Sequence, residues 1–237
     1  MNSNISPQLP VVLVACAVFK NLLENLLPDD LAAEVTFLDY GLHSIPKNLK
    51  VAVQEALDAI EEPSLVVLGY GLCGNGLDGI QAGNHTLLIP RADDCIAIFL
   101  GSYAAYRREF DENPGTYYLT KGWLESGSDP LREYENMIEK YGQETADWLM
   151  NEQYQNYKRL LFVAHTQDDL DTYAPRARQV GEYMSRWGVG YDEVSGSDNY
   201  LRQLANAARE LKTGNDDFLV IYPGGELKQS KFVRVKT

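Results

Sequence analysis

The sequence predicts an α/β fold built on parallel β-sheets, and two observations support this prediction. Short runs of almost continuous apolar residues recur along the chain, which is typical of strands buried on both faces. Between these runs lie longer segments whose apolar residues recur at helical spacing. Strands that alternate with helices in this way indicate a parallel sheet with helices packed on both faces.

The first half of the chain contains four predicted strands. The helix between the second and third strands begins at the Pro46 region, ends before Pro63, and carries its apolar side chains at helical spacing. A glycine-rich loop, 69–83, separates the third strand from the fourth. We expect strands at 11–15, 34–39, 65–68 and 86–89, with helices at 20–27 and 47–61.

The second half repeats this rhythm, with expected strands at 159–164, 191–194 and 218–222 and helices at 170–187 and 199–211. The spacing predicts two Rossmann-like parallel-sheet lobes facing one another across a cleft, with one long parallel sheet as the alternative. Between the halves, 130–157 is polar with an apolar stripe, which predicts a connecting helical hairpin. The expected division is a first lobe at 1–125, a helical connector at 126–158 and a second lobe at 159–237.

Composition limits the partners and the compartment. The 237 residues include 34 acidic and 21 basic side chains, and the net charge of -13 argues against nucleic acid or an anionic membrane as a partner. The first ten residues lack the positive region and the long apolar stretch of a signal peptide or membrane anchor, so a cytoplasmic location is expected. In that reducing compartment three cysteines remain free as ligands or nucleophiles.

All three cysteines and one of the three histidines lie just beyond predicted strands. Cys16, His43, Cys73 and Cys95 follow the first to fourth strands in that order. Because the carboxyl ends of parallel strands share one edge of a sheet, we expect these side chains to converge there. Thiolate and imidazole are ligands for zinc, iron or an iron–sulfur cluster, so the sequence predicts a metal centre. The alternative is that each cysteine is an ordinary small side chain of the core.

The histidines differ in their expected positions. His85 precedes the fourth strand and is expected at the opposite edge of the sheet. His165 ends the first strand of the second lobe, where it is a candidate for proton transfer. For His43, a solvent-exposed or core histidine is an equally good interpretation.

Charged residues and glycines complete the expected site. Arg91 is a candidate to hold an anionic group, and Asp93 or Asp94 to accept a proton or to orient a histidine, with solvated loop charges as the alternative. The run from Gly69 has the form Gly-x-Gly-x-x-Gly, but Cys73 interrupts it and no clear helix follows. We expect its backbone to approach a bulky inorganic centre or cofactor instead. The expected cofactor-binding residues are Gly71, Gly74, Asn75 and Arg91, together with Gly224 and Gly225, whose alternative is a plain tight turn.

The motifs around these residues resemble those of the domain of unknown function 1638 family of bacteria and archaea. They are Ala15-Cys16, Leu38-Asp-Tyr-Gly-Leu-His43, Gly69-Tyr-Gly-Leu-Cys73-Gly-Asn, Ile89-Pro-Arg-Ala-Asp-Asp-Cys95, Leu100-Gly-Ser102 and Pro114-Gly-Thr-Tyr-Tyr-Leu, continuing to Gly122-Trp123. Family members resemble companions of corrinoid-dependent methyltransferase systems, which implies a role in one-carbon metabolism and a corrinoid or a corrinoid protein as partner. Relatives read His-Asp-Cys where this chain has Asp93-Asp94-Cys95, so the resemblance assigns no role to Asp93.

The expected protein is thus a cytoplasmic metalloprotein in which the three cysteines and His43 bind zinc or an iron–sulfur cluster. If it is an enzyme, methyl transfer to a small-molecule substrate is the expected reaction, because a thiolate-rich zinc site activates a substrate thiol at neutral pH. Asp94 and His165 are then the candidate catalytic residues. The alternatives are a non-catalytic carrier, activator or assembly factor for a corrinoid or iron–sulfur centre, and a metal-free binding module. The substrate, the metal and the oligomeric state stay open.

Overall fold

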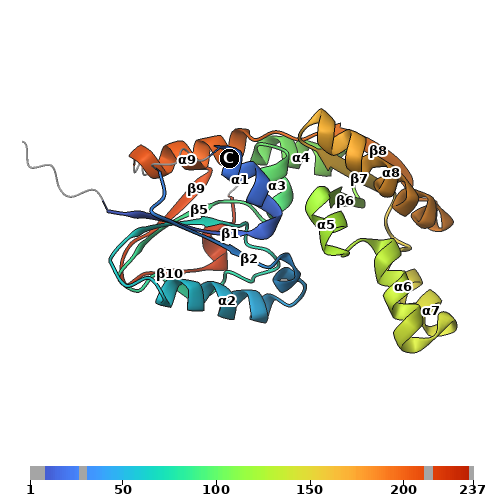
Figure 1. Ribbon diagram of the computed structural model, residues 1–237, viewed down its shortest axis with the longest axis horizontal. Helices are drawn as coiled ribbons and strands as arrows, with labels where there is room; N and C mark the ends of the chain where they lie inside the picture. The colour runs from blue at the N-terminus through green and yellow to red at the C-terminus, as the bar shows by residue number, and fades with distance from the viewer. Residues whose placement is uncertain (1–8, 27–30, 211–215, 235–237) are drawn as a thin grey trace, which may run out of the picture. The chain divides into compact units, whose positions relative to one another are not determined.

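The chain forms two compact units. The computed structural model describes residues 9–26, 31–210 and 216–234. Unit 1 comprises Met1–Ile98 and Asn199–Thr237, and unit 2 comprises Phe99–Asp198 (Figure 1). None of the helices in these described ranges has the length and apolar character needed to span a bilayer.

Unit 1 is built on a five-stranded sheet in the order β2-β1-β3-β5-β9. Its strands are β1 (Val11–Cys16), β2 (Glu34–Leu38), β3 (Leu65–Gly69), β5 (Thr86–Pro90) and β9 (Phe218–Ile221). The first four strands are parallel, whereas β9 runs antiparallel to β5. From β1 the chain continues to β2, which pairs with one edge of β1, and then crosses over to β3, which pairs with the other edge of β1. The β1/β3 boundary is therefore a topological switch point, the place where open α/β sheets bind ligands.

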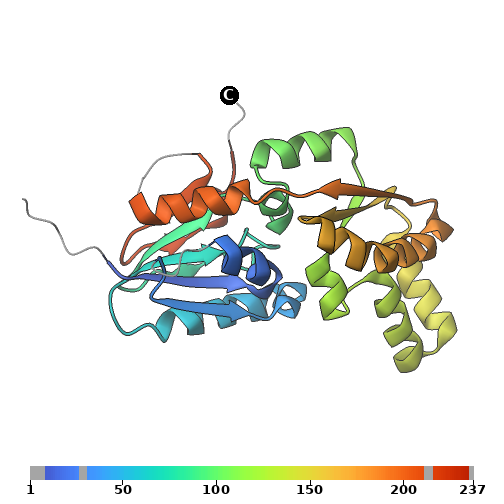
Figure 2. The same ribbon diagram turned by 45° about the horizontal axis from the view of Figure 1, so that its top comes forward.

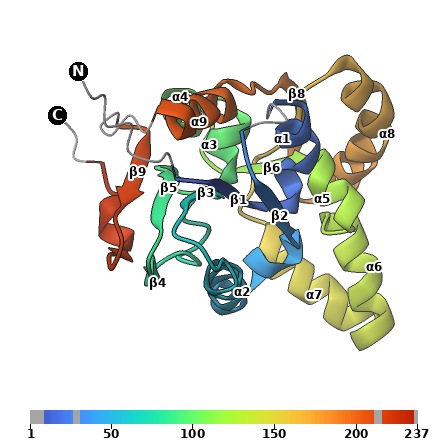
Figure 3. The same ribbon diagram turned by 60° about the vertical axis from the view of Figure 1, so that its left-hand side comes forward.

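Helices cover both faces of this sheet. On one face lies α2 (Pro46–Asp58), whose buried side chains Leu49, Val53 and Leu57 recur at helical spacing, and on the other lie α1 (Lys20–Leu26) and α9 (Asn199–Glu210) (Figures 1 and 3). The remaining elements of unit 1 are the short helices η1 (Ala17–Phe19), η2 (Tyr40–Ser44), α3 (Cys95–Phe99) and η4 (Gln229–Lys231), and the antiparallel pair β4 (Ile80–Gln81) and β10 (Glu226–Leu227).

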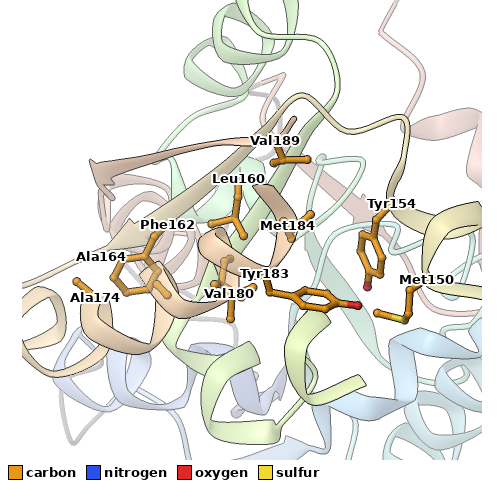
Figure 4. Packing of buried hydrophobic residues seen from close by; sticks show 12 residues of the cluster. Met150, Tyr154, Leu160, Phe162, Ala164, Ala174, Val180, Tyr183, Met184 and Val189 are labelled. Atoms are coloured by element: carbon orange, nitrogen blue, oxygen red, sulfur yellow. The ribbon is translucent and has the colours of Figure 1, made fainter. Parts of the chain in front are cut away.

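Unit 2 contains a three-stranded parallel sheet in the order β6-β7-β8. Figure 4 shows Leu160 and Phe162 of β7 packed with Val180 and Met184 of α8, within one buried apolar cluster. The strands are β6 (Thr116–Thr120), β7 (Arg159–Ala164) and β8 (Gly190–Ser195), and the helices are α4 (Tyr103–Glu112), α5 (Lys121–Ser126), α6 (Pro130–Tyr141), α7 (Gln143–Tyr154), α8 (Gln167–Met184) and η3 (Ser185–Trp187). Parallel strands joined by helices in both units confirm the predicted α/β class.

The division into units differs from the expected boundaries at 125 and 158. Strand β9 pairs with β5, so the segment from Asn199 onward completes unit 1 instead of a second lobe. Strand β6 lies before 125 and pairs with β7, so it belongs to unit 2. The expected hairpin is present as α6 and α7 (Figure 2), but both helices form part of the β6-to-β7 crossover within unit 2. Apolar periodicity locates a strand but does not say which sheet it joins.

Candidate functional site

The candidate site lies where the carboxyl ends of β1 and β3 approach each other closely. Ala15 and Gly69 are paired in register there, and a Cβ added to Gly69 would lie 2.5 Å from the Cβ of Ala15. Only glycine fits this position without a shift of the neighbouring strand. The residues that follow are Cys16, the last residue of β1, and Tyr70, the first residue after β3, and both lie at the switch point.

Cys16 is the last residue of β1 and is only 8% exposed. Burial raises the pKa of its thiol to about 11, and the Asp39 carboxylate raises it further, while the Val18 N–H donates to the sulfur and opposes the rise. Asp39 follows β2 and accepts a hydrogen bond of 2.7 Å from the Gly41 N–H. In the metal-free protein the Cys16 thiol is therefore neutral at pH 7.

Cys73 lies in the loop after β3, which is tied to the segment before α3. The Leu72 N–H donates to Ala92 O at 2.8 Å and the Cys73 N–H donates to Asp93 O at 3.0 Å. A Cβ on Gly71 would lie 2.7 Å from the Asp94 backbone, so a glycine permits this contact. These bonds extend the β3–β5 pairing beyond the strands and bring the loop that carries Cys73 alongside the segment that carries Cys95.

The backbone around Cys73 is unusual. Cys73, Gly74 and Asn75 all have positive φ, at 49°, 61° and 70°. Two of the three are not glycine, and such residues rarely adopt the left-handed region outside constrained turns. Gly74 and Asn75, both expected to contact a cofactor, are exposed at this edge.

Cys95 is the first residue of α3 and is half-buried. The preceding residue, Asp94, accepts a hydrogen bond of 2.8 Å from the Ile96 N–H, and burial raises the pKa of its carboxyl group. Asp94 thus holds the first turn of α3 in place, with its charge close to the thiols of Cys73 and Cys95.

The three thiols are electrostatic neighbours. Burial, then Cys16 and then Asp94 raise the pKa of Cys73 to about 12. Burial raises the pKa of Cys95 well above its usual value, and Cys73, Asp94 and Cys16 add to this rise. Across the described ranges, however, no three or more His, Cys, Asp or Glu side chains stand in an arrangement that could hold a metal ion. The structure brings the thiols to one edge of the sheet without closing them into a ligand set.

Tyr70 was not among the expected site residues. Its side chain is 2% exposed, and its hydroxyl has no hydrogen-bond partner among the described residues. Burial raises the pKa of this phenol most, and Cys16, Cys73 and Asp39 also raise it. Tyr70 and Asp39 directly follow β3 and β2, so the strand-end argument that selected the cysteines would also have found them.

Two histidines of unit 1 lie in different surroundings. His43 is in η2, half-buried, and its Nδ1–H donates to Tyr40 O. His85 is 4% exposed and its Nδ1 accepts the Ser64 N–H at 3.3 Å, just before β3 begins. His85 therefore lies at the amino edge of the parallel strands, opposite to the cysteines.

Arg91 and the Gly224–Gly225 turn both contact other segments of unit 1. Arg91 donates to Val233 O at 2.6 Å and pairs with Asp216 at 3.8 Å, so it fastens the C-terminal segment of unit 1. The Gly224 N–H donates to Gly83 O at 2.7 Å. Because β9 runs antiparallel, the turn after it lies at the amino edge of the parallel strands of unit 1, opposite to the cysteines.

His165 belongs to unit 2, directly after β7. Its Nε2–H donates to Phe99 O at 3.1 Å, and its ring packs against the Phe99 ring with centroids 5.3 Å apart. A Cβ on Gly196 would lie 2.5 Å from His165 Nε2, so the glycine makes room for the imidazole. Burial lowers the pKa of His165, which favours the neutral ring at pH 7.

Comparison with known proteins places these motifs in one family. Neither the curated proteins nor the solved structures gave a match. Residues 37–205, which include the turn with His43 and both loops carrying Cys73 and Cys95, match the family described as protein of unknown function DUF1638. The match covers more than half of the chain, and the protein therefore belongs to the DUF1638 family.

Proposed function

We propose that unit 1 binds a soft metal centre, zinc or an iron–sulfur cluster, through Cys16, Cys73 and Cys95. The observation that carries the proposal is that all three cysteines of the chain lie at the carboxyl edge of three neighbouring strands, where Cys16 raises the pKa of Cys73 and both raise the pKa of Cys95. Thiolates select zinc, Cu(I) and iron–sulfur clusters over hard cations. Burial and neighbouring negative charges disfavour the thiolate form of these cysteines. A bound cation favours it, because the cation supplies the opposite charge that the site lacks.

The donor set fits such a centre, with one requirement. Since no three donors among the described residues stand within reach of a common metal ion, loading requires the thiols to rotate toward one another. The cysteines are placed for this, because they lie at a strand end, in a loop and in the first turn of a short helix. The unpartnered hydroxyl of Tyr70 in the same cluster is a second sign that the site lacks a component.

His43 is the proposed fourth ligand. Histidines that bind metals usually donate their other ring N–H to a carbonyl or carboxylate, which fixes the tautomer and the ring orientation. The bond from His43 Nδ1–H to Tyr40 O has this form, and Nε2 is the proposed ligating atom.

For the reaction we propose methyl transfer in corrinoid-linked one-carbon metabolism, which rests on the resemblance of the motifs. When bound in a thiolate-rich site, zinc lowers the pKa of a substrate thiol and so prepares it as a methyl acceptor. Asp94 is the proposed acceptor of the thiol proton, since its carboxylate lies beside Cys73 and Cys95. The exposed backbone of Gly74 and Asn75 at the same edge is the proposed contact for the partner cofactor.

The proposal is tested by metal analysis of protein purified without oxygen. Cys16→Ser, Cys73→Ser and Cys95→Ser should each lose most of the bound metal, whereas His85→Gln at the opposite edge should retain it. Visible charge-transfer bands would identify an iron–sulfur centre, and a colourless protein with one equivalent of zinc would favour the methyl-transfer site. Full metal retention by all three serine variants would exclude the thiol site. Metal binding without methyl transfer would favour a carrier or assembly factor.

A further inference from the structure

We propose that Tyr70 donates a hydrogen bond from its phenol to a thiolate sulfur of the loaded site. This inference rests on the proposed metal site and adds a residue that binds no metal itself. Tyr70 directly follows β3 at the switch point, and its side chain is almost completely buried. The groups whose charges act on its hydroxyl are Cys16, Cys73 and Asp39.

The hydroxyl is a donor without an acceptor. Native proteins rarely leave a buried hydroxyl unpaired, because desolvation of the group is then not offset by any hydrogen bond. Tyr70 Oη nevertheless has no partner within the described part of the chain. No cysteine sulfur in the described ranges stands in hydrogen-bonding position to it either, so the contact forms only when a thiol rotates toward the phenol.

Loading of the site supplies the missing acceptor. A cysteine that binds a metal loses its proton, and its sulfur then carries negative charge. Hydrogen bonds to a charged acceptor are about twice as strong as those between neutral groups. The Tyr70 O–H therefore gains its best partner only in the loaded state, and the hydrogen bond stabilises that state over the metal-free one.

A direct oxygen ligand is the other role that a tyrosine could take here. That role needs an ionised phenol, and an ionised phenol would add a further negative charge to a cluster that already contains Asp39 and the thiolates. A neutral phenol that donates a hydrogen bond to sulfur adds no negative charge. Such donors are among the groups that set the electronic properties of thiolate-bound metals.

The chain offers a matched control. Tyr183 in unit 2 is 8% exposed and its hydroxyl also has no partner among the described residues. Tyr183 belongs to the apolar core of unit 2, and the cysteines belong to unit 1. Tyr70→Phe and Tyr183→Phe thus each remove one phenol oxygen. The first lies in the thiol cluster, which consists of Cys16, Cys73, Cys95 and their neighbours Tyr70, Asp39 and Asp94, and the second lies in a core that contains no thiol.

The experiment compares both variants with the wild type in two measurements, the thermal melting of the metal-free protein and the zinc affinity by competition with a chelator. Both metal-free variants should melt no earlier than the wild type, because the lost hydroxyl had no partner. Tyr70→Phe should bind zinc roughly tenfold more weakly, as expected for the loss of one hydrogen bond to a charged group, and Tyr183→Phe should bind it as the wild type does.

Two results would overturn this role. Wild-type zinc affinity in Tyr70→Phe would show that the hydroxyl does not contact the loaded site. A metal-free Tyr70→Phe protein that melts earlier than the wild type would show that the hydroxyl already has a partner. If the wild type binds neither zinc nor an iron–sulfur cluster, or if Cys16→Ser binds zinc unchanged, the proposed metal site fails and the Tyr70 contact fails with it. Wild-type zinc affinity in Tyr70→Phe, together with weak binding by Cys16→Ser, overturns the Tyr70 contact alone.

Discussion

Gly69 and Ala15 meet across the β1–β3 pair with no room for a side chain on the glycine, because a Cβ there would lie 2.5 Å from the Ala15 Cβ. The next residues along the two strands are Tyr70 and Cys16, the two most buried polar members of the thiol cluster. The separation of β1 and β3 at this pair therefore sets the distance between the tyrosine and the first cysteine.

This relationship predicts the effect of Gly69→Ala. The added methyl group must push the strands apart, and overpacking of this kind costs about 1–3 kcal/mol of unfolding free energy. Gly190→Ala in β8 is the control, since its Cβ would meet nothing closer than 3.9 Å. Urea denaturation measures the unfolding free energy of both variants. Equal stability of the two variants would contradict the close approach.

His85 makes stability depend on pH. Burial lowers the pKa of this histidine below its usual value, and its Nδ1 accepts the Ser64 N–H, which requires the unprotonated ring. As the pH falls through the ordinary histidine range, the unfolded chain takes up a proton that the folded protein resists, so stability is lost. Between about pH 7.5 and 5.5 the wild type should lose more unfolding free energy than His85→Gln, measured by chemical denaturation. A parallel pH profile in the two proteins would refute this role of His85.

Asp129 anchors the helical hairpin of unit 2. Its buried carboxylate accepts the Leu131 and Arg132 N–H groups at 3.0 Å at the start of α6 and pairs with Arg176 at 3.2 Å. Asp129→Ala removes the cap and leaves Arg176 without this partner, so unfolding should become easier by about 2 kcal/mol. Asp129→Asn keeps an oxygen for the cap and should lose less. The ranking is checked by thermal melts, and an alanine variant as stable as the asparagine variant would show that the cap contributes little.

Removal of metal should leave the fold intact. Each unit has its own buried core, formed in unit 1 around β1, β3 and β5 and in unit 2 around β7 and α8. Cores of this size fold without help from a metal, unlike those of zinc fingers. Chelated protein should keep its far-ultraviolet circular dichroism, and a coil spectrum after chelation would instead identify a structural metal.

The elements best predicted from the sequence are those whose pattern is local. The strands at β1, β3 and β5 follow from their apolar runs, and α2 follows from its helical spacing and the proline at its start. Strand β6 was not among the expected strands, because its residues, Thr116 to Thr120, give no apolar run. The direction of β9 depends on its pairing with β5 more than a hundred residues earlier, which no local pattern encodes.

The candidate site shows the same limit. Residues that follow parallel strands lie at one edge of the sheet. The sequence shows that Cys16, Cys73 and Cys95 each follow a predicted strand, so their common edge was predictable. The backbone bonds from Leu72 and Cys73 to the segment before α3 are contacts between loops, which the sequence does not reveal. Gly224 and Gly225 were expected after the last strand of a second lobe, but that strand, β9, is the antiparallel edge strand of unit 1.

X-ray absorption at the metal edge of protein purified without oxygen tests the central claim most directly, because it counts the atoms bound to the metal. We expect a first shell with three cysteine sulfurs from the protein if the metal is zinc, at about 2.3 Å, with one lighter ligand from His43. Cys73→Ser should remove one sulfur from that shell. A first shell made only of nitrogen and oxygen would contradict the thiol site.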